Sequence, residues 1–454
     1  YRSSRGLGDV YKRQMEVTYG EAKYFQNTII PYLTFKKRNI KKRIDLNLFS
    51  SYNVIAKQRV DTSRNIYNWY GEIDGYRTVG GEQKRTLNQL NEHVWLNRIN
   101  AVYKLNSNQR IIINNVSSFL TRKENDPILT SKNDGYWAPQ RLFKNVFGLS
   151  YKGELFTKKF KYSVFLKNFH YTAAIKTSEY LNGNLLFSNS TVTGNQMGYG
   201  TAISYSPNKQ LTLLASIEKV ARLPESDEIL GDGLTVLYSD SLRPERSLNA
   251  NLGLRYSFFQ NKPNQLLWTT NLFYRDVTDL IQRYQYDLGS FVNVNFQKVE
   301  ISGIDCSIEY RFKKALTVQY AFSYLNPIIK SKKDLQGNDN IAYDSRLPNT
   351  PFLMQNATAS YSIENPFKQK GNLFIYWSAS HIGKFYRYSE SIGQFDKDFI
   401  PAQFVNSCGV GYQFFKDKMS VSFDARNIFD TQTFDNYAIQ KPGRAFFAKL
   451  MFNI

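Results

Sequence analysis

Long hydrophobic runs, cysteines and histidines are the features that this sequence has little of. No stretch reaches the roughly 18 apolar residues of a membrane-spanning helix, which excludes a helical membrane protein. The 2 cysteines, Cys306 and Cys408, lie too far apart for a zinc or redox motif, so we expect both to be small packing residues. The 3 histidines have no partner at metal-ligand spacing and no catalytic-triad motif. The sequence therefore predicts no enzyme, no metal site and no cofactor.

Aromatic residues are abundant in a chain that is polar overall. The 454 residues include 32 Tyr and 33 Phe, yet the mean hydropathy is −0.46. A single large β-barrel explains this combination, because aromatic rings suit the lipid face and its two interfaces while the interior stays wet.

Connections between strand-like segments alternate strictly between brief and long. The brief ones lie at 206–210, 312–316 and 414–419, and the long ones at 221–247, 326–352 and 428–444. Bacterial outer-membrane barrels have tight periplasmic turns and long outward loops. The pattern therefore predicts an all-β fold, an antiparallel up-and-down transmembrane barrel.

Apolar and polar residues alternate with a period of two inside the predicted strands. Ile304 and Ile308 share one face, whereas Asp305 and Glu309 share the other, as expected for lipid outside and water inside. We predict about seventeen strands. They lie at 22–35, 42–56, 92–105, 109–121, 142–152, 160–176, 197–206, 211–220, 247–258, 266–275, 293–312, 316–325, 353–363, 371–382, 404–414, 418–427 and 444–454.

The formal net charge is +21, and basic groups such as Lys41-Lys42-Arg43 and Lys158-Lys159 fall at the brief turns. Nucleic-acid binders gather their basic residues on one face or in an arm, so no nucleic-acid partner is predicted. Solvated turns explain these groups, and contact with anionic head groups beside the barrel rim is the alternative.

Residues 1–14 are unlike the remainder of the chain. Asp9 to Gln14 reads as the translated end of a sequencing-library transposon, so we exclude 1–14 and assign 15–454 to the C-terminal part of a barrel. In a barrel of about 22 strands with both termini periplasmic, strand direction makes the visible set the sixth to the twenty-second. We therefore expect a fragment whose sheet is open or irregularly closed between residues near Tyr24 and Phe447.

Several segments in the second half carry recognisable motifs in a consistent order. They are Arg222 with Pro224 and Glu225, Pro244 with Glu245 and Ser247, Gly303, Asn427 with Phe429 and Asp430, and Pro442-Gly443-Arg444 with Phe446. These segments resemble those of TonB-dependent outer-membrane receptors. One departure is the end of the chain, where Asn453 and Ile454 follow the aromatic residue on which the family commonly finishes. We interpret the motif residues as structural, since proline ends a strand and glycine permits close backbone approach.

The resemblance implies an active importer in the outer membrane of a Gram-negative bacterium. Such a receptor carries an N-terminal plug and a short box that couples to the TonB energy complex, and neither is present in this chain. Its partners would be outer-membrane lipid or lipopolysaccharide, the TonB complex, and a small-molecule or oligosaccharide ligand. A ferric siderophore or other iron chelate is the ligand favoured.

Ligand contact is predicted in the outward loops, where aromatic rings and arginines cluster. Aromatic rings stack on planar chelates or sugars, and arginine pairs with carboxylate or phosphate. The residues are Trp69, Tyr70, Arg77, Trp137, Arg141, Tyr386, Arg387 and Tyr388.

Two other functions remain open from the sequence. A passive porin-type channel would lack a plug and energy coupling. A secreted β-rich adhesin or binding module would not partition into detergent.

The first prediction concerns the reading frame upstream of Met15 in the source genome. We expect it to encode a plug domain and a TonB-coupling box, because the family's import cycle uses both. Sequencing that region checks this expectation, and an in-frame stop codon directly upstream of Met15 would contradict it.

Overall fold

The computed structural model describes most of the chain after residue 22. The described residues are 17–18, 23–60, 65–67, 73–76, 87–125, 139–181, 184–232, 236–259, 263–285, 291–313, 315–334, 337–366, 371–387, 399–414, 418–436 and 439–452.

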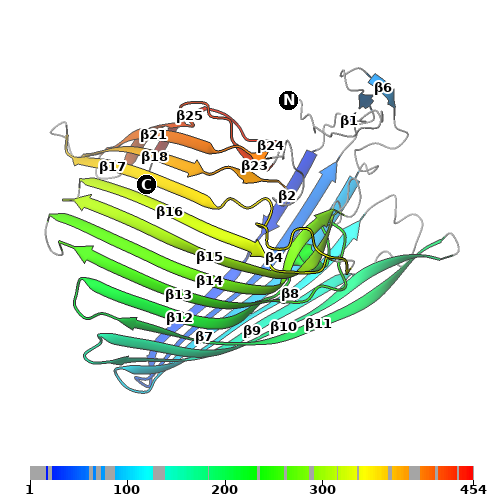
Figure 1. Ribbon diagram of the computed structural model, residues 1–454, viewed down its shortest axis with the longest axis horizontal. Coiled ribbons are helices and arrows are strands. Elements are labelled where there is room, and N and C mark those ends of the chain that lie inside the picture. The colour runs from blue at the N-terminus through cyan, green and yellow to red at the C-terminus, as the bar shows by residue number, and fades with distance from the viewer. Residues whose placement is uncertain are drawn as a thin grey trace.

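One antiparallel sheet forms a barrel-shaped wall in which strands pair in chain order (Figure 1). The wall strands are β2 (Lys23–Ile29), β3 (Tyr32–Ile40), β4 (Ile44–Val60), β7 (Leu87–Lys104), β8 (Gln109–Asn125), β9 (Gln140–Leu155), β10 (Phe160–Leu181), β11 (Asn184–Tyr205), β12 (Leu211–Arg222), β13 (Glu245–Phe258), β14 (Asn264–Gln285), β15 (Phe291–Phe312), β16 (Leu316–Ile329), β17 (Leu353–Glu364), β18 (Gly371–Ile382), β21 (Gln403–Phe414), β22 (Met419–Arg426) and β25 (Ala445–Phe452).

Several shorter elements are not part of the wall sheet. They are β1 (Val17–Thr18), β5 (Asn65–Tyr67) and β6 (Ile73–Tyr76) in one sheet, the hairpins β19 (Phe385–Tyr386) with β20 (Phe399–Ile400) and β23 (Phe434–Asn436) with β24 (Ile439–Gln440), and the one-turn helix α2 (Ser226–Ile229). No helix within the described residues is long and apolar enough to span a bilayer.

The predicted number of strands is confirmed. In the part of the chain that the structure describes, the wall comprises 18 strands. β2 and β3 both pair with β4 and together occupy one position, so the wall has 17 strand positions. Pro31 separates these two half-strands, since proline has no N–H to donate to the ladder. The tight turns lie at the left of Figure 1 and the longer connections at the right, as the alternation predicts.

Two connections that we expected to be long are instead continuations of the wall strands. β10 and β11 stay paired up to Leu181 and Asn184, and β14 and β15 up to Gln285 and Phe291. Residues 188–191 read Ser-Asn-Ser-Thr, polar on both faces, because both faces of a hairpin that projects beyond the wall meet water. Period-2 hydrophobicity disappears there although the backbone pairing continues.

The first and last strands are the edges of the wall. β2 and β3 pair with β4 and β25 pairs with β22, and no pairing among the described residues joins β25 to β2 or β3. Nearly every residue of β2, β3 and β25 is exposed, which is what a strand with one neighbour shows. The described pairings thus leave the sheet unclosed between Tyr24 and Phe447, in agreement with the expectation of an open or irregular closure there.

The convex face of the wall is apolar and uncovered by any described residue. Leu252, Ile308 and Phe423 are 62%, 43% and 58% exposed, although burial of such side chains is the rule in a water-soluble fold. The neighbouring positions in the same strands carry Asn251, Glu309 and Asp424 toward the concave side. This is the two-faced alternation of a transmembrane barrel, apolar outward and polar inward.

The second prediction compares two substitutions one residue apart in β22. Phe423→Arg puts a charge on the convex face and should destabilise the folded barrel in lipid vesicles by about 2–4 kcal/mol. Ser422→Arg puts the same charge on the concave face and should cost much less. Urea titrations in phosphatidylcholine vesicles measure both, and equal losses would contradict the assignment of the two faces.

Candidate functional site

The connection between β12 and β13 turns inward and lies across the concave face. We call residues 223–244 the inner segment, of which 233–235 are outside the described residues. Leu223, Ile229, Leu230 and Leu242 are at most 7% exposed, and each contributes about 1.5–3 kcal/mol by leaving water. They pack with a cluster from β8, β9, β10 and β14, made of Leu120, Leu142, Phe169, Tyr171, Ala173, Ile175 and Ile281.

The inner segment reaches both sides of the wall. On one side the Tyr171 hydroxyl of β10 donates to the Leu242 carbonyl at 2.6 Å. On the other, the Leu237 N–H donates to the Phe291 carbonyl of β15 at 2.7 Å, and Asn293 Nδ2 donates to the Glu228 carbonyl at 3.3 Å. Because β11 to β14 separate these two anchors in the sheet, the segment crosses the interior as a chord.

A buried ionic network attaches the helix of the inner segment to β7 and β8. The guanidinium of Arg122 is 1% exposed and its Nε donates to Glu92 Oε1 at 2.7 Å. The same guanidinium also binds the Asp227 carboxylate and the Gly231 carbonyl of the inner segment. Lys57 Nζ lies 3.4 Å from Glu92 Oε2, so two cations balance two carboxylates. A buried charge persists only when it is paired and hydrogen-bonded in this way.

A second group of ion pairs binds the start of the inner segment to β12 and β13. Arg222 donates two hydrogen bonds of 2.7 Å to the Glu245 carboxylate and also binds Glu228, which closes the α2 capping box with Glu225. Glu245 Oε1 also accepts the Ile281 N–H at 2.7 Å. The motif residues Arg222 and Glu245 therefore clamp the two strands that flank the segment.

The remaining motif residues of this region fill space or end strands. Pro224 is buried two residues after the end of β12, and Pro244 is buried directly before β13. Ser247 lies in the β12–β13–β14 ladder. Glu225 pairs with Lys144 of β9 at 2.6 Å. On β15, a Cβ at Gly303 would lie 2.3 Å from the ring of Phe273, so glycine there makes room for the cross-strand aromatic side chain.

The motif near the end of the chain is a hydrogen-bonded turn. The Asn427 side chain accepts from the Thr431 N–H at 2.9 Å and donates to its carbonyl at 2.8 Å. Asp430 Oδ1 accepts the Arg444 N–H at 2.7 Å, and a Cβ at Gly443 would lie 2.5 Å from that oxygen. These contacts hold the start and the end of the connection 427–444 close to each other in space. Pro442, Phe429 and Phe446 are exposed around it.

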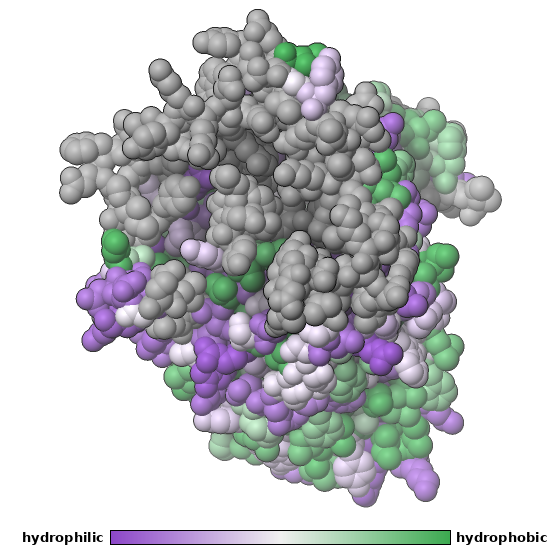
Figure 2. Space-filling model, turned by 90° about the vertical axis from the view of Figure 1, so that its right-hand side faces the viewer, coloured by the Kyte–Doolittle hydropathy of each residue, from purple (hydrophilic) through white to green (hydrophobic). Residues whose placement is uncertain are grey.

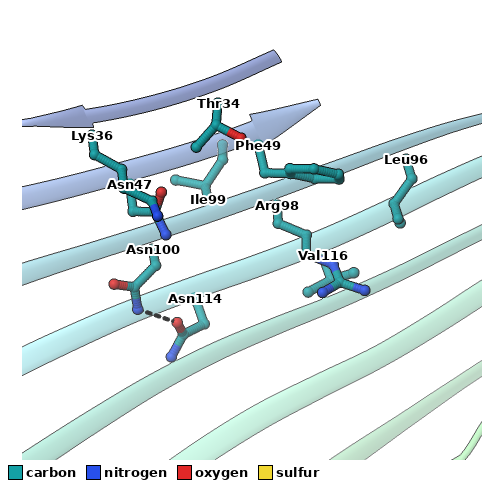
Figure 3. Close-up of a pocket in the computed structure, with 10 residues that line it drawn as sticks. All are labelled: Thr34, Lys36, Asn47, Phe49, Leu96, Arg98, Ile99, Asn100, Asn114 and Val116. Atoms are coloured by element: carbon teal, nitrogen blue, oxygen red, sulfur yellow. Dashed lines mark hydrogen bonds between the residues drawn. The ribbon is translucent and has the colours of Figure 1, made fainter. Parts of the chain in front are cut away.

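A groove of about 450 Å³, lined by both polar and apolar side chains, lies on the same concave face (Figure 3). Arg98 and Asn100 of β7 share a strand face with Glu92 at even spacing, and Lys36 of β3 faces them. Asn100 donates to Asn114 across to β8. Other lining residues are Thr34, Asn47, Phe49, Leu96, Ile99 and Val116. The lumen wall therefore carries amide groups and two cations that can bind a polar ligand or a segment inside the lumen.

Two carboxylates in the connection 330–352 pair with separate lysines. Asp339 binds Lys333 at 2.7 Å, and Asp344 binds Lys330, whose pKa it raises by hydrogen bonding. Among the described residues no three His, Cys, Asp or Glu side chains form a metal-binding group.

The predicted ligand-contact residues are only partly placed. Trp69, Tyr70, Arg77, Trp137 and Tyr388 lie outside the described residues. Arg141 is exposed on β9, on the face opposite buried Leu142. Tyr386 and Arg387 are half-buried beside β20, and Lys384 Nζ lies 3.9 Å from the ring centre of Phe399 and 5.4 Å from that of Tyr386. A role for these residues in ligand binding stays a prediction.

In Figure 2, which shows the right-hand side of Figure 1, apolar side chains gather along the right and lower right of the wall, with hydrophilic side chains among and beside them. The family model described as TonB dependent receptor-like, beta-barrel matches residues 23–428.

The chain belongs to the TonB-dependent receptor family.

This confirms the resemblance seen in the motifs and extends it to the first half of the chain. No curated protein matches the sequence.

Solved TonB-dependent receptor structures share this fold. Copper transporter OprC superposes with a TM-score of 0.69 at 15% identity, over 95% of this chain and 66% of that one. The FrpB iron transporter from Neisseria meningitidis (F5-1 variant) gives 0.65 at 14% identity, over 92% and 62%. The ferric-catecholate import receptor Fiu from E. coli K12 gives 0.64 at 14% identity, over 94% and 64%. The chain spans less than two thirds of the length of each of these receptors.

Sequence reasoning missed the inner segment and its buried network. We expected the connection 221–247 to be a charged outward loop. The connection does carry charged side chains, but its apolar side chains are buried against the concave face of the wall. Six Leu or Ile residues within the connection 221–247 were the available signal, because an outward loop has no surface to bury them against.

The third prediction concerns the buried guanidinium. Arg122→Met leaves buried Glu92 with Lys57 as its one remaining described cation and removes the Arg122–Asp227 ion pair, so it should destabilise the barrel by about 3–5 kcal/mol. Arg110→Met, at the exposed end of the same strand, is the control and should change stability by less than about 0.5 kcal/mol. Urea unfolding followed by the heat-dependent shift on gel electrophoresis reports both, and equal effects would contradict the role of Arg122 in attaching the inner segment to the wall.

Proposed function

We propose that this chain forms the barrel of an outer-membrane, TonB-dependent importer in a Gram-negative bacterium. The match of the family model over 23–428 carries the proposal. The apolar convex face and the charged concave face support it, because both are needed for a polar solute path through hydrocarbon. The TonB complex would act through the N-terminal plug and coupling box of the complete receptor.

The ligand class that we propose is a metal chelate, with a ferric siderophore as the favoured case. The structural neighbours are named as a copper transporter, an iron transporter and receptors for ferric chelates. The described mouth of this chain offers Lys384 beside two aromatic rings, and the lumen offers Arg98 and Lys36. Cations and aromatic faces suit an anionic chelate with planar donor groups.

The fourth prediction is TonB-dependent uptake. The complete reading frame is expressed in a Gram-negative host that lacks its own ferric-siderophore receptors, and radioactive iron is supplied as catecholate, hydroxamate and citrate chelates. We expect accumulation of at least one chelate in the host with TonB and none in the isogenic host without it. Lys384→Ala should lower accumulation severalfold, since it removes the cation between the two rings, and Lys418→Ala at a tight turn should not.

The outcome separates the alternatives left open by the sequence. Equal uptake with and without TonB would indicate a passive channel and contradict energy coupling. Binding of an oligosaccharide with no chelate uptake would contradict the ligand class while leaving the importer intact.

A further inference from the structure

Basic side chains concentrate at the tight-turn end of the wall. The β3–β4 turn carries Lys41, Lys42 and Arg43, and the β9–β10 turn carries Lys158 and Lys159, all exposed. Hydrogen bonds within each turn, such as Lys42 N–H to the Asn39 carbonyl at 3.0 Å and Lys159 N–H to the Phe156 carbonyl at 3.1 Å, hold these side chains at one end of the barrel.

The nearby carboxylates are already neutralised. Asp45 pairs with Lys104 at 2.8 Å, and Glu154 lies 3.9 Å from Lys161. In the part of the chain that the structure describes, no ion pair involves Lys41, Lys42, Arg43, Lys158 or Lys159. The opposite end differs, because the inner segment there carries Glu225, Asp227, Glu228, Asp232 and Asp240. These exposed cations are therefore available to a partner outside the chain.

Large apolar side chains stand among these cations. Phe156 at the tip of the β9–β10 turn is 75% exposed, and Leu155 beside it is 43% exposed. Phe259 and Phe312, at two further tight turns, are 48% and 38% exposed. These rings continue the apolar convex face to the very end of the strands. Apolar rings at the tips of turns favour a lipid interface over nucleic acid as the partner. A lipid interface buries such rings, and the neighbouring lysines extend to the head groups.

From this arrangement we infer that the tight turns form a collar that binds anionic phospholipid head groups. The turn collar comprises Lys41, Lys42, Arg43, Phe156, Lys158 and Lys159. The aromatic tip enters the boundary between head groups and acyl chains, and the ammonium and guanidinium groups bind the lipid phosphates. The inference rests on the proposed outer-membrane location, and it assigns the collar to the periplasmic leaflet because tight turns are periplasmic in such barrels.

The fifth prediction measures lipid preference directly. The full chain is folded in detergent with equal amounts of phosphatidylglycerol and phosphatidylcholine and purified, and the bound lipids are quantified by mass spectrometry. We expect phosphatidylglycerol to be enriched at low salt and the enrichment to vanish at high salt. Lys41→Gln with Lys42→Gln and Arg43→Gln should lower the ratio of anionic to neutral lipid by up to about fivefold for each charge removed.

A matched control removes three lysines from the opposite end. Lys330→Gln with Lys332→Gln and Lys333→Gln alters the net charge equally but leaves the collar intact, so its lipid ratio should equal that of the wild type. A second variant, Lys158→Gln with Lys159→Gln, repeats the test if the first triple variant folds poorly. An unchanged ratio in both collar variants, or an equal loss in the control, would overturn the inference.

Folding in vesicles keeps this test separate from the proposed function. A chain that acquires the heat-shifted folded form in neutral vesicles, yet shows no preference for anionic lipid, contradicts the collar alone. A chain that folds in neither neutral nor anionic vesicles contradicts the membrane barrel itself.

Discussion

Hydrocarbon offers no hydrogen bonds, so every backbone N–H and C=O within the membrane must find its partner on a neighbouring strand. This constraint explains why the wall consists of long strands that pair in chain order, and why proline appears at strand breaks such as Pro31. It also makes the two edge positions exceptional. β2, β3 and β25 present one unpaired side each among the described residues, and their side chains are exposed as a consequence.

The same constraint shapes the interior. A barrel of this width has a concave face too large for its own side chains to fill, and the inner segment occupies part of it. Its buried leucines and isoleucines provide the stabilising free energy, whereas Arg122, Glu92 and Asp227 determine where it attaches. Burying Arg122 and Glu92 is costly, so these ions serve mainly to fix the position of the segment. A shifted segment would remove Asp227 from the buried guanidinium of Arg122.

Charge is distributed along the barrel axis in the same two-ended way. Carboxylates gather in the inner segment near the long connections, where they bind arginines of the wall. Exposed basic side chains such as Lys41, Lys42 and Lys158 gather at the tight turns. The formal net charge of +21 is therefore not spread evenly over the surface. An end-to-end asymmetry of this kind suits a protein whose two ends face different environments.

Much of the wall could be read from the sequence, because lipid on one face and water on the other impose a period-two pattern that needs no knowledge of neighbours. Ile304 and Ile308 opposite Asp305 and Glu309 are enough to assign both faces of β15, and the motif prolines locate the ends of β12 and β13. Prediction failed at residues 188–191, where water on both faces removes the pattern, and the loop aromatics Trp69 and Trp137 lie outside the described residues. Only the tertiary structure brings Arg122 of β8 to Asp227, 105 residues away, and places the inner segment across the lumen. The local sequence pattern determines which face of the sheet a side chain lies on. A buried ion pair depends instead on the curvature of the sheet, which brings residues from distant parts of the chain together in the lumen.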